Sequence, residues 1–499
     1  MRNTGRAGGI RKTPEGAAIQ ARRASEWVSC ACETHLPAYQ PDGRLPLVAP
    51  GMCSSWTDES VSLHTAAPRQ SSICGIAAFL FTAVVFFCWI GFRFGLNTPP
   101  SSTGDESSYD SMAWELSCGH GFAVDYDAPA FRTPYDDAAK TQPELFTIRS
   151  STPGLIAFRP PLLSTLAAGL NVVFGRQFYA VRSLNVLLMA ATAGLLAWYV
   201  CREAGFVTAL ISITFYLVDV RSRLYARSLL TEPLACFLAT LLTITLLGIV
   251  KHTNHKRLIL AGVLTGASVL TRSIVVLWLP GLTVFVYFVV RRIHKHSWRD
   301  AAARTALFLA VTLAVFAPWG IRNVMLLDRF SPMGTQGLME LSAGYSDAAW
   351  DNYGVWQNLG AQGFFDAVDT SGLSNVETEL AMAEVSSSKA VEWISRNFAK
   401  LVPLAGMKIF SEFRPHNVVE FIVLMFAMIG LFTSRRTAAW VFSVLLVTNA
   451  FSVALTWSVE GRFLVPQLFI LHALCAVGVW CCARGLQSTL NKTKRSSAV

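Results

Sequence analysis

The sequence is short of charge. Only 15% of its 499 residues are Asp, Glu, Lys or Arg, whereas 53% are hydrophobic and the mean hydropathy is +0.42. Soluble domains of this length carry more charge, and this balance is typical of a protein whose solvent is largely lipid. We therefore expect an all-α integral membrane protein.

Several motifs of soluble enzymes are also missing. The chain has no Gly-rich nucleotide-binding loop, no His-Glu-x-x-His and no Gly-x-Ser-x-Gly. These absences argue against a nucleotide as the activated donor of a reaction. The cysteines add little, because Cys118 alone falls in an expected external loop, and an external intramolecular disulfide is not expected. The three N-terminal cysteines form no recognisable metal-ligand spacing with the nearby histidines.

What the chain does have is long apolar runs. About ten of them approach the roughly 20 residues that cross a bilayer. The predicted spans lie near 73–94, 179–200, 205–219, 232–250, 257–271, 274–290, 304–321, 418–434, 438–457 and 463–483. Residues 1–72 contain no such run and are expected to form a flexible cytoplasmic extension, with no signal peptide before the first span. Met52 leaves open a later start of translation.

The basic residues are distributed unevenly along this topology. Segments expected on one face hold 23 of the 42 Lys and Arg residues but 8 of the 32 Asp and Glu residues. The positive-inside rule places that face in the cytoplasm. The net charge of +10 therefore reflects topology, and a nucleic-acid partner is not expected.

This orientation places both long polar loops on the extracytoplasmic face. The expected organisation is an extension (1–72), a membrane module (73–322) with a first external loop (97–161), a second external loop (323–417), C-terminal helices (418–483) and a cytoplasmic tail (484–499). The protein is thus expected to be multi-pass, in the inner or plasma membrane, with its active site on the extracytoplasmic face.

Short polar motifs gather on the same face as these loops. They are Asp105-Glu106, Arg159-Pro160-Pro161, residues 221–227, Thr231-Glu232-Pro233, Thr271-Arg272-Ser273, residues 318–323 and residues 460–463. Guanidinium groups bind phosphate bidentately, and a carboxylate beside a phosphate could take a proton from an attacking hydroxyl. The combination favours group transfer from a lipid-linked phosphate to an acceptor outside the cytoplasm.

The order of these motifs resembles a known family. The same motifs follow each other in C-type-fold glycosyltransferases that use polyprenyl-phosphate sugars. In this chain they are Gly104-Asp105-Glu106 with Tyr109, Arg159-Pro160-Pro161-Leu162, Tyr225-Ala226-Arg227 with Thr231-Glu232-Pro233, Gly262 and Gly266 with Leu270-Thr271-Arg272, Pro318-Trp319 with Arg322-Asn323, and Arg462-Phe463. The resemblance is to the protein O-mannosyltransferase and aminoarabinose-to-lipid-A transferase group, and it covers roughly 74–345 and 418–483.

The resemblance implies roles for individual residues. Asp105 would be the catalytic carboxylate, Glu106 would hold the adjacent acidic position as a second catalytic candidate, and Arg159 would lie at the lipid-phosphate site. We further predict that Arg272 and Arg462 hold the donor phosphate. Further candidates for substrate contact are Tyr109, Tyr225, Arg227, Glu232 and Arg322. Members with a metal carry an acidic residue where this chain has Phe158, so we expect no metal there and predict no cofactor, leaving a divalent metal elsewhere open.

Each role has a simpler alternative. The acidic pair could be solvated beside the membrane, Arg159 and the arginines of 221–227 could contact lipid headgroups, and Glu232 could cap a helix that begins at Pro233. A lipid-linked-sugar flippase or secondary transporter is the alternative function, although the chain has no clear internal repeat. A non-enzymic scaffold would not need the convergence of arginines. The sugar and the acceptor, whether lipid, glycan or protein, are left open.

Overall fold

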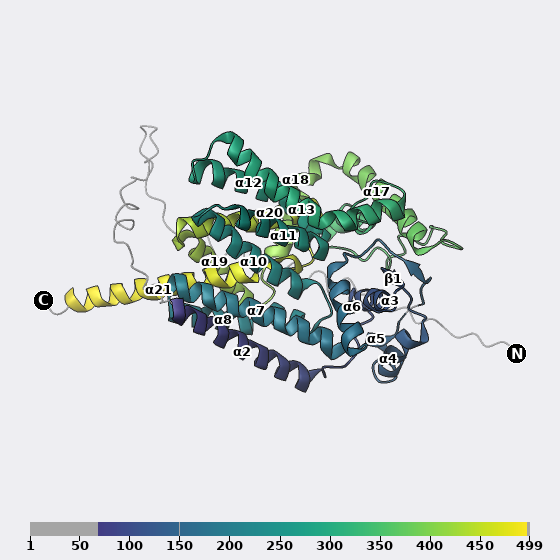
Figure 1. Cartoon of the computed structure of the whole chain (residues 1–499), viewed down its shortest axis with the longest axis horizontal. Helices are drawn as coiled ribbons and strands as arrows, with labels where there is room; N and C mark the ends of the chain where they lie inside the picture. The colour runs from purple at the N-terminus through teal and green to yellow at the C-terminus, as the bar shows by residue number, and fades with distance from the viewer. Residues whose placement is uncertain (1–67, 149, 497–499) are drawn as a thin grey trace, which may run out of the picture. The chain divides into compact units, whose positions relative to one another are not determined.

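The computed structural model describes residues 68–148 and 150–496, and the predicted extension falls almost wholly outside them. The described part is nearly all helical (Figure 1). Its single strand pair joins β1 (Ala123–Val124) to β2 (Gly154–Leu155) in antiparallel register, with Ala123 opposite Leu155. The expected all-α membrane fold is confirmed.

The helices follow each other along the chain as follows. They are α2 (Pro68–Arg93), α3 (Glu106–Ser117), α4 (Pro129–Ala139), α5 (Pro143–Phe146), α6 (Leu162–Phe174), α7 (Phe178–Ala204), α8 (Phe206–Val218), α9 (Val220–Arg227), α10 (Glu232–Lys251), α11 (His255–Thr271), η2 (Ser273–Trp278), α12 (Leu279–Phe288), η3 (Val289–Ile293), α13 (Trp298–Leu327), α14 (Gln336–Met339), α15 (Leu341–Gly344), α16 (Asp347–Asp351), α17 (Asn375–Arg396), η4 (Phe398–Lys400), α18 (Leu401–Phe413), α19 (Val418–Thr433), α20 (Arg436–Leu455), η5 (Arg462–Gln467) and α21 (Leu468–Ser496).

Seven helical segments of the described residues are long and apolar enough to cross a membrane. They are Pro68–Arg93, Phe178–Ala204, Glu232–Lys251, Ser273–Ile293, Trp298–Leu327, Arg436–Leu455 and Arg462–Asn491. An eighth arises if Phe398–Phe413 and Val418–Thr433, which meet at 111°, form one broken span. Each of the seven coincides with a predicted span.

The other three predicted spans fall on shorter helices. The segment 418–434 corresponds to α19, one half of the bent pair. The segments 205–219 and 257–271 correspond to α8 and α11, which have 13 and 17 residues. At 1.5 Å per residue, α8 measures only about 20 Å against a hydrocarbon core of about 30 Å. The predicted count of ten spans is therefore not confirmed.

Two glycines of the sequence motifs explain one tight helix contact. A Cβ on Gly262 of α11 would lie 2.8 Å from the carbonyl oxygen of Phe308, and one on Gly266 would lie 2.7 Å from Cβ of Val315. Both partners are on α13. Helices in lipid associate by close packing of small residues, so this pair brings the two backbones together.

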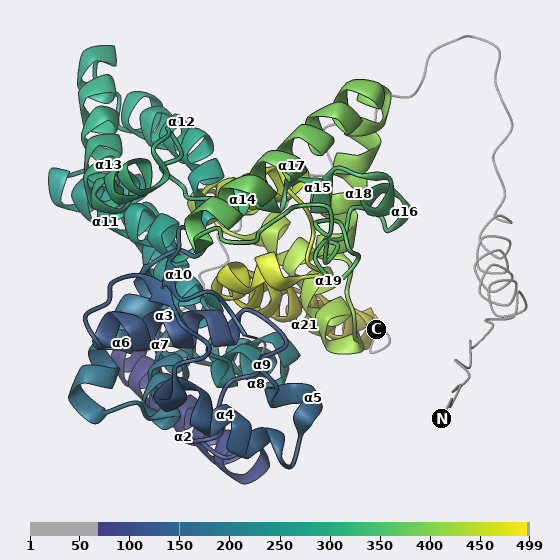
Figure 2. The same ribbon diagram turned by 90° about the vertical axis from the view of Figure 1, so that its right-hand side faces the viewer.

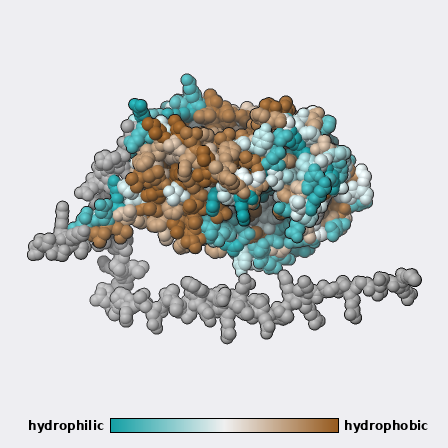
Figure 3. Space-filling model, turned by 90° about the horizontal axis from the view of Figure 1, so that it is seen from below, coloured by the Kyte–Doolittle hydropathy of each residue, from teal (hydrophilic) through white to brown (hydrophobic). Residues whose placement is uncertain are grey.

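The two long loops gather at one end of the helices and touch each other. In Figure 1, α3, α4 and α5 lie at the same end of the helices as α17, and Figure 2 shows this end from the front. The Asn375 Nδ2 donates to the carbonyls of Thr152 (2.7 Å) and Gly154 (3.2 Å), and the Thr335 N–H donates to the Ala157 carbonyl at 3.3 Å. On the face drawn in Figure 3, hydrophilic residues gather at this end, and hydrophobic residues cover the spanning helices.

Candidate active site

The carboxylate of Asp105 lies between two arginines that are far away in the sequence. Asp105 precedes the first residue of α3, and its Oδ1 accepts from Arg159 Nη2 at 2.7 Å. Its Oδ2 accepts from Arg462 Nη2 at 2.9 Å. The three residues come from the start of α3, the loop before α6, and η5. The structure thus brings together a predicted carboxylate and two predicted phosphate ligands.

Arg462 also joins this site to a second carboxylate, which is buried. Glu232 is the first residue of α10, and its Oε1 accepts from Arg272 Nη1 at 2.7 Å and from Arg462 Nε. The Glu232 side chain is fully buried. The result is an alternating row of five charges, which we call the arginine–carboxylate cluster: Arg159, Asp105, Arg462, Glu232 and Arg272. It carries three positive and two negative charges.

A carboxylate that the sequence analysis missed holds Arg462 in place. Glu412, near the end of α18, accepts from the Phe463 N–H at 2.6 Å, the Val459 N–H at 2.9 Å and the Ser458 hydroxyl at 3.0 Å. Gly461, between these donors, has a φ of +90°, a conformation that a side chain would strain. Glu412 is the one carboxylate in α18, a mostly apolar helix that also carries Lys408, and this was the signal that could have found it.

Aromatic rings cover the outer arginines of the cluster. The Arg159 guanidinium lies 4.5 Å from the Phe158 ring centre and 5.6 Å from that of Tyr109. Arg272 lies 5.1 Å from the ring centre of Phe463. Such cation–π contacts hold a guanidinium in one orientation while leaving its N–H donors free for hydrogen bonds.

The electrostatics of Asp105 are dominated by its partners. Burial by itself would raise the pKa of the Asp105 carboxyl, but the charges of Arg159 and Arg462 outweigh burial and hold this pKa below its usual value. Asp105 is therefore ionised at neutral pH and is a weak base as long as both guanidinium groups remain on it.

A second carboxylate near Arg159 has the opposite perturbation. Glu340 lies between α14 and α15 and accepts from Trp356 Nε1 at 2.6 Å. Burial raises the pKa of its carboxyl, and the hydrogen bond from Trp356 and the charge of Arg159 offset this only in part. No sequence pattern marked Glu340, because it stands in a polar loop without periodicity.

A third carboxylate fixes the chain just before Arg159. Glu379 of α17 accepts from the Ala157 N–H at 3.0 Å and from the Thr335 hydroxyl at 2.7 Å. The segment that carries α17 therefore positions a residue of the long loop between α2 and α6. This contact also was not foreseen.

Glu106 does not join the cluster, although it follows Asp105 directly. Its Oε2 accepts from the Ser101 N–H at 3.2 Å. Burial raises the pKa of its carboxyl, and Arg182 and Arg227 are the charged side chains that counteract this effect. Arg227 itself lies over the Phe94 ring at 4.1 Å. Glu106 and Arg227 thus belong to a neighbouring polar region.

The remaining predicted residues divide between the cluster and its surroundings. Tyr109 is buried under Arg159. Burial and the charge of Glu232 raise the pKa of the Tyr225 hydroxyl, and the charges of Arg462 and Arg272 oppose this rise. Arg322 lies apart, donating to the Phe122 carbonyl at 3.3 Å and covering the Trp319 ring at 4.7 Å.

Among the described residues, no group of three or more His, Cys, Asp and Glu side chains could hold a metal ion. The carboxylates of the cluster are instead neutralised by guanidinium groups. What the arrangement offers is a set of donors for an anion, with one ionised carboxylate beside them.

One segment of the chain matches a known protein family. Residues 158–321, about a third of the chain, match the family described as dolichyl-phosphate-mannose-protein mannosyltransferase. The predicted resemblance is confirmed. The matched segment contains Arg159, Glu232 and Arg272 but neither Asp105 nor Arg462. It indicates a membrane glycosyltransferase.

Solved structures with some likeness include two membrane transferases. One is the apo oligosaccharyltransferase of Archaeoglobus fulgidus, at 14% identity and a TM-score of 0.48, with 84% of this chain and 52% of that chain covered. The other is ArnT from Cupriavidus metallidurans bound to undecaprenyl phosphate, at 14% identity and a TM-score of 0.39, covering 81% of this chain and 77% of that chain. The chain therefore spans about half the length of the oligosaccharyltransferase. No curated protein matches the sequence.

Proposed function

We propose that this protein is a membrane glycosyltransferase that moves a monosaccharide from a polyprenyl-phosphate donor to an extracytoplasmic acceptor. The observation that carries the proposal is the arginine–carboxylate cluster. It sets three guanidinium groups and an ionised, partly accessible carboxylate at one end of the spanning helices. The family match over 158–321 and the ArnT structure, whose bound ligand is undecaprenyl phosphate, support a lipid-phosphate donor.

The donor phosphate would compete with the carboxylates for the same guanidinium groups. Arg159 and Arg462 have further N–H donors beyond those that bind Asp105, and phosphate oxygens accept such forks bidentately. The inferred leaving group is the lipid phosphate, whose oxygen gains negative charge as the bond to the sugar C1 breaks. Preorganised guanidinium groups stabilise that charge.

The same competition would activate Asp105. A phosphate that draws Arg159 or Arg462 away from Asp105 removes the charges that depress its pKa, so the carboxylate becomes a stronger base when donor is bound. The acceptor hydroxyl then attacks C1 from the face opposite the phosphate, its proton passes to Asp105, and the configuration at C1 inverts. Without donor, the base stays weak.

The experiment is sugar transfer from a radiolabelled polyprenyl-phosphate sugar pool in membranes that contain the full chain. Asp105→Asn is expected to lower transfer at least about 100-fold, the usual minimum for loss of a general base, while donor lipid still binds. Arg272→Ala is expected to weaken donor binding as well. Asp137→Asn, which changes an exposed carboxylate paired with Lys140 in the same loop, is the matched control and should transfer at the wild-type rate.

One pattern of results would assign the chain to transport instead. If Asp105→Asn transfers sugar at the wild-type rate, and labelled lipid accumulates in one leaflet when the protein is removed, the chemistry lies elsewhere. The cluster would then be a passage for the lipid phosphate.

A further inference from the structure

A second feature built from charges lies at the other end of the spanning helices. Starting from Glu232 in the cluster, the 20 residues of α10 end at Lys251. At 1.5 Å per residue this helix measures about 30 Å, the thickness of a hydrocarbon core. Lys251 therefore marks the opposite membrane face, as do Glu203 near the end of α7 and Arg435 before α20.

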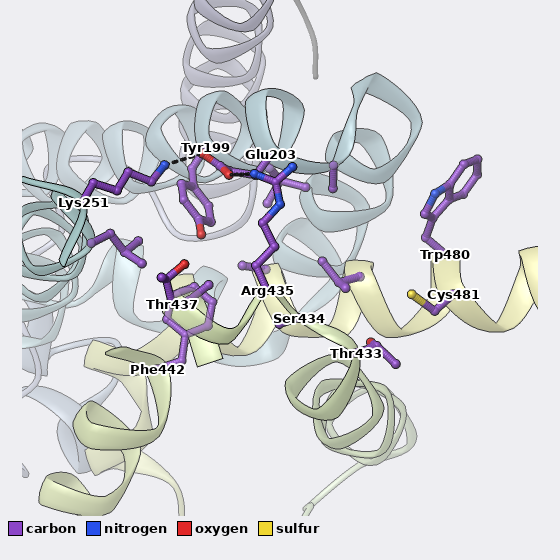
Figure 4. Close-up of a pocket in the computed structure, with 16 residues that line it drawn as sticks. Tyr199, Glu203, Lys251, Thr433, Ser434, Arg435, Thr437, Phe442, Trp480 and Cys481 are labelled. Atoms are coloured by element: carbon purple, nitrogen blue, oxygen red, sulfur yellow. Dashed lines mark hydrogen bonds and ion pairs between the residues drawn. The ribbon is translucent and has the colours of Figure 1, made fainter. Parts of the chain in front are cut away.

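These three residues form the rim of a cavity of about 90 Å³, which we call the Glu203 pocket. Glu203 accepts from Lys251 Nζ at 2.9 Å and from Arg435 Nη1 at 3.0 Å. Figure 4 shows the Glu203 carboxylate between the two cations. The rim has a net charge of +1. Both cations are about half exposed, so each keeps N–H donors for another anion.

Below this rim the walls are apolar. They are contributed by α7, α10, α20 and α21, and they include Leu247, Phe442, Ala473 and Val477. Leu247 lies one turn before Lys251 on α10. The apolar wall therefore adjoins the charged rim at the membrane depth where the acyl chains of a lipid join its headgroup. A soluble ligand would leave such walls unused, whereas a lipid presents both chemistries in this order.

A buried hydrogen-bond donor without a protein partner lies at the pocket. The indole N–H of Trp480 is buried and donates to no acceptor within the part of the chain that the structure describes. Trp480 lines the pocket, and Arg484 lies 4.8 Å from its ring centre, which adds a further cation at this side. A buried donor without an acceptor costs about 1–3 kcal/mol, so an acceptor supplied by a ligand would stabilise this arrangement.

We propose that the Glu203 pocket binds an anionic phospholipid of the leaflet opposite the cluster. Its phosphate would sit at Lys251 and Arg435, and the start of an acyl chain would enter between Leu247 and Phe442. Because the rim has a net positive charge, it favours an anionic headgroup over a zwitterionic one. The carrier lipid of the proposed reaction has its phosphate site at the far end of α10, so an ordinary membrane lipid is the occupant that fits.

The site would also have a structural consequence. Glu203 ties α7 to α10 and to the link between α19 and α20, and a phosphate bridging Lys251 and Arg435 would strengthen the same tie. A ligand that binds only the folded state raises the midpoint of thermal unfolding, and the shift grows with the ratio of ligand concentration to Kd. Bound lipid is therefore expected to be measurable both directly and as stability.

The experiment uses the purified full chain in detergent, titrated with phosphatidylglycerol or with phosphatidylcholine of the same acyl chains. Bound lipid is counted by native mass spectrometry, and thermal unfolding is recorded in parallel. We expect phosphatidylglycerol to bind more tightly than phosphatidylcholine. Because one basic residue near an anionic lipid contributes roughly a fivefold change in affinity, the double variant Lys251→Gln/Arg435→Gln should bind phosphatidylglycerol roughly 25-fold more weakly.

Two further variants separate this site from the general positive charge of that face. Glu203→Gln removes the competing anion and should bind phosphatidylglycerol several-fold more tightly than wild type. Arg292→Gln removes an exposed cation near the end of η3, outside the pocket, and should bind like wild type. If the double variant is too unstable to purify, the opposite shift in Glu203→Gln still decides the question.

The proposal is overturned by any of three results. Equal affinity for the two phospholipids would show that the pocket does not select an anionic headgroup. An equal loss in Arg292→Gln and in the double variant would make the effect one of net charge. Retention of phosphatidylglycerol by the double variant, with loss of a polyprenyl phosphate instead, would make the pocket a site for the carrier lipid. None of these results depends on sugar transfer.

Discussion

The two ends of α10 carry charges in very different settings. At one end Glu232 is fully buried and shared by Arg272 and Arg462, and at the other Lys251 is about half exposed and bound to Glu203. A buried carboxylate needs close compensation, because breaking a buried pair leaves an uncompensated charge, whereas a pair in water contributes little to stability. The first arrangement is a fixed framework, and the second can exchange partners.

The largest effect should come from breaking the buried end. Glu232→Gln is expected to lower the free energy of unfolding by about 3–5 kcal/mol, because Arg272 and Arg462 lose their buried partner. Glu203→Gln, the same change at the other end, should cost less than about 1 kcal/mol in lipid-free detergent. Unfolding of both variants is measured by denaturant titration in the same detergent. Equal losses would show that the two ends do not differ.

Within the cluster end, Asp105→Asn should have an intermediate effect with a defined pH dependence. The folded-state pKa of Asp105 is lowered, so its stabilisation is present above the unfolded value of 3.8 and is lost as pH falls through the folded value. At pH 7 we expect a loss of about 1–2 kcal/mol, because two charge-assisted hydrogen bonds weaken. The loss should persist at pH 5 in thermal unfolding curves. Its disappearance already at pH 5 would contradict the lowered pKa.

The neighbouring Glu340 should behave in the opposite way. Its folded-state pKa is raised, so its contribution to stability is fully present below the unfolded value of 4.5 and is lost as pH rises through the folded value. Glu340→Gln keeps an acceptor for Trp356 without the charge and should stabilise the protein by less than about 1 kcal/mol at pH 7.5. The difference from wild type should vanish at pH 4. A destabilised variant at pH 7.5 would instead indicate that the ionised carboxylate is needed by Arg159.

The smallest effect is expected at the exposed pair. Arg435→Gln should lower stability by less than about 0.5 kcal/mol, and 0.5 M salt should abolish this difference, since exposed charges are screened. The loss in Glu232→Gln should survive the same salt. Denaturant titrations at low and high salt, run on both variants, test whether burial sets the contrast between the two ends.

The chemistry-bearing residues were largely visible as interruptions of apolar sequence. Asp105, Arg159, Arg272 and Arg462 each lie near the end of an apolar segment, and the structure places all four in one cluster. Glu106, next to Asp105, turns to Ser101 instead. Successive residues at the start of a helix point about 100° apart, so adjacency in sequence does not mean a shared site. The catalytic roles themselves stay predictions.

Glu340, Glu379 and Glu412 were not foreseen, for a related reason. Their function depends on backbone N–H groups and side chains of distant segments, such as Glu412 on Phe463 and Glu379 on Ala157. No spacing along the chain encodes such contacts. Only Glu412 left a trace, because a carboxylate inside an apolar helix needs a partner.

By itself, then, the sequence determined that the chain lies in a membrane and which polar motifs lie at the ends of its apolar segments, although it predicted ten spans where the described residues hold seven long ones. The reason is that lipid admits long apolar helices and excludes charge, and this rule acts on local stretches of chain. Tertiary structure alone decided that Arg462 binds both Asp105 and Glu232, and that Glu379 of α17 holds the segment before Arg159. It also decided that Glu203, Lys251 and Arg435 line one pocket at the opposite end of α10. These pairings depend on how the helices pack, which no single stretch of sequence specifies.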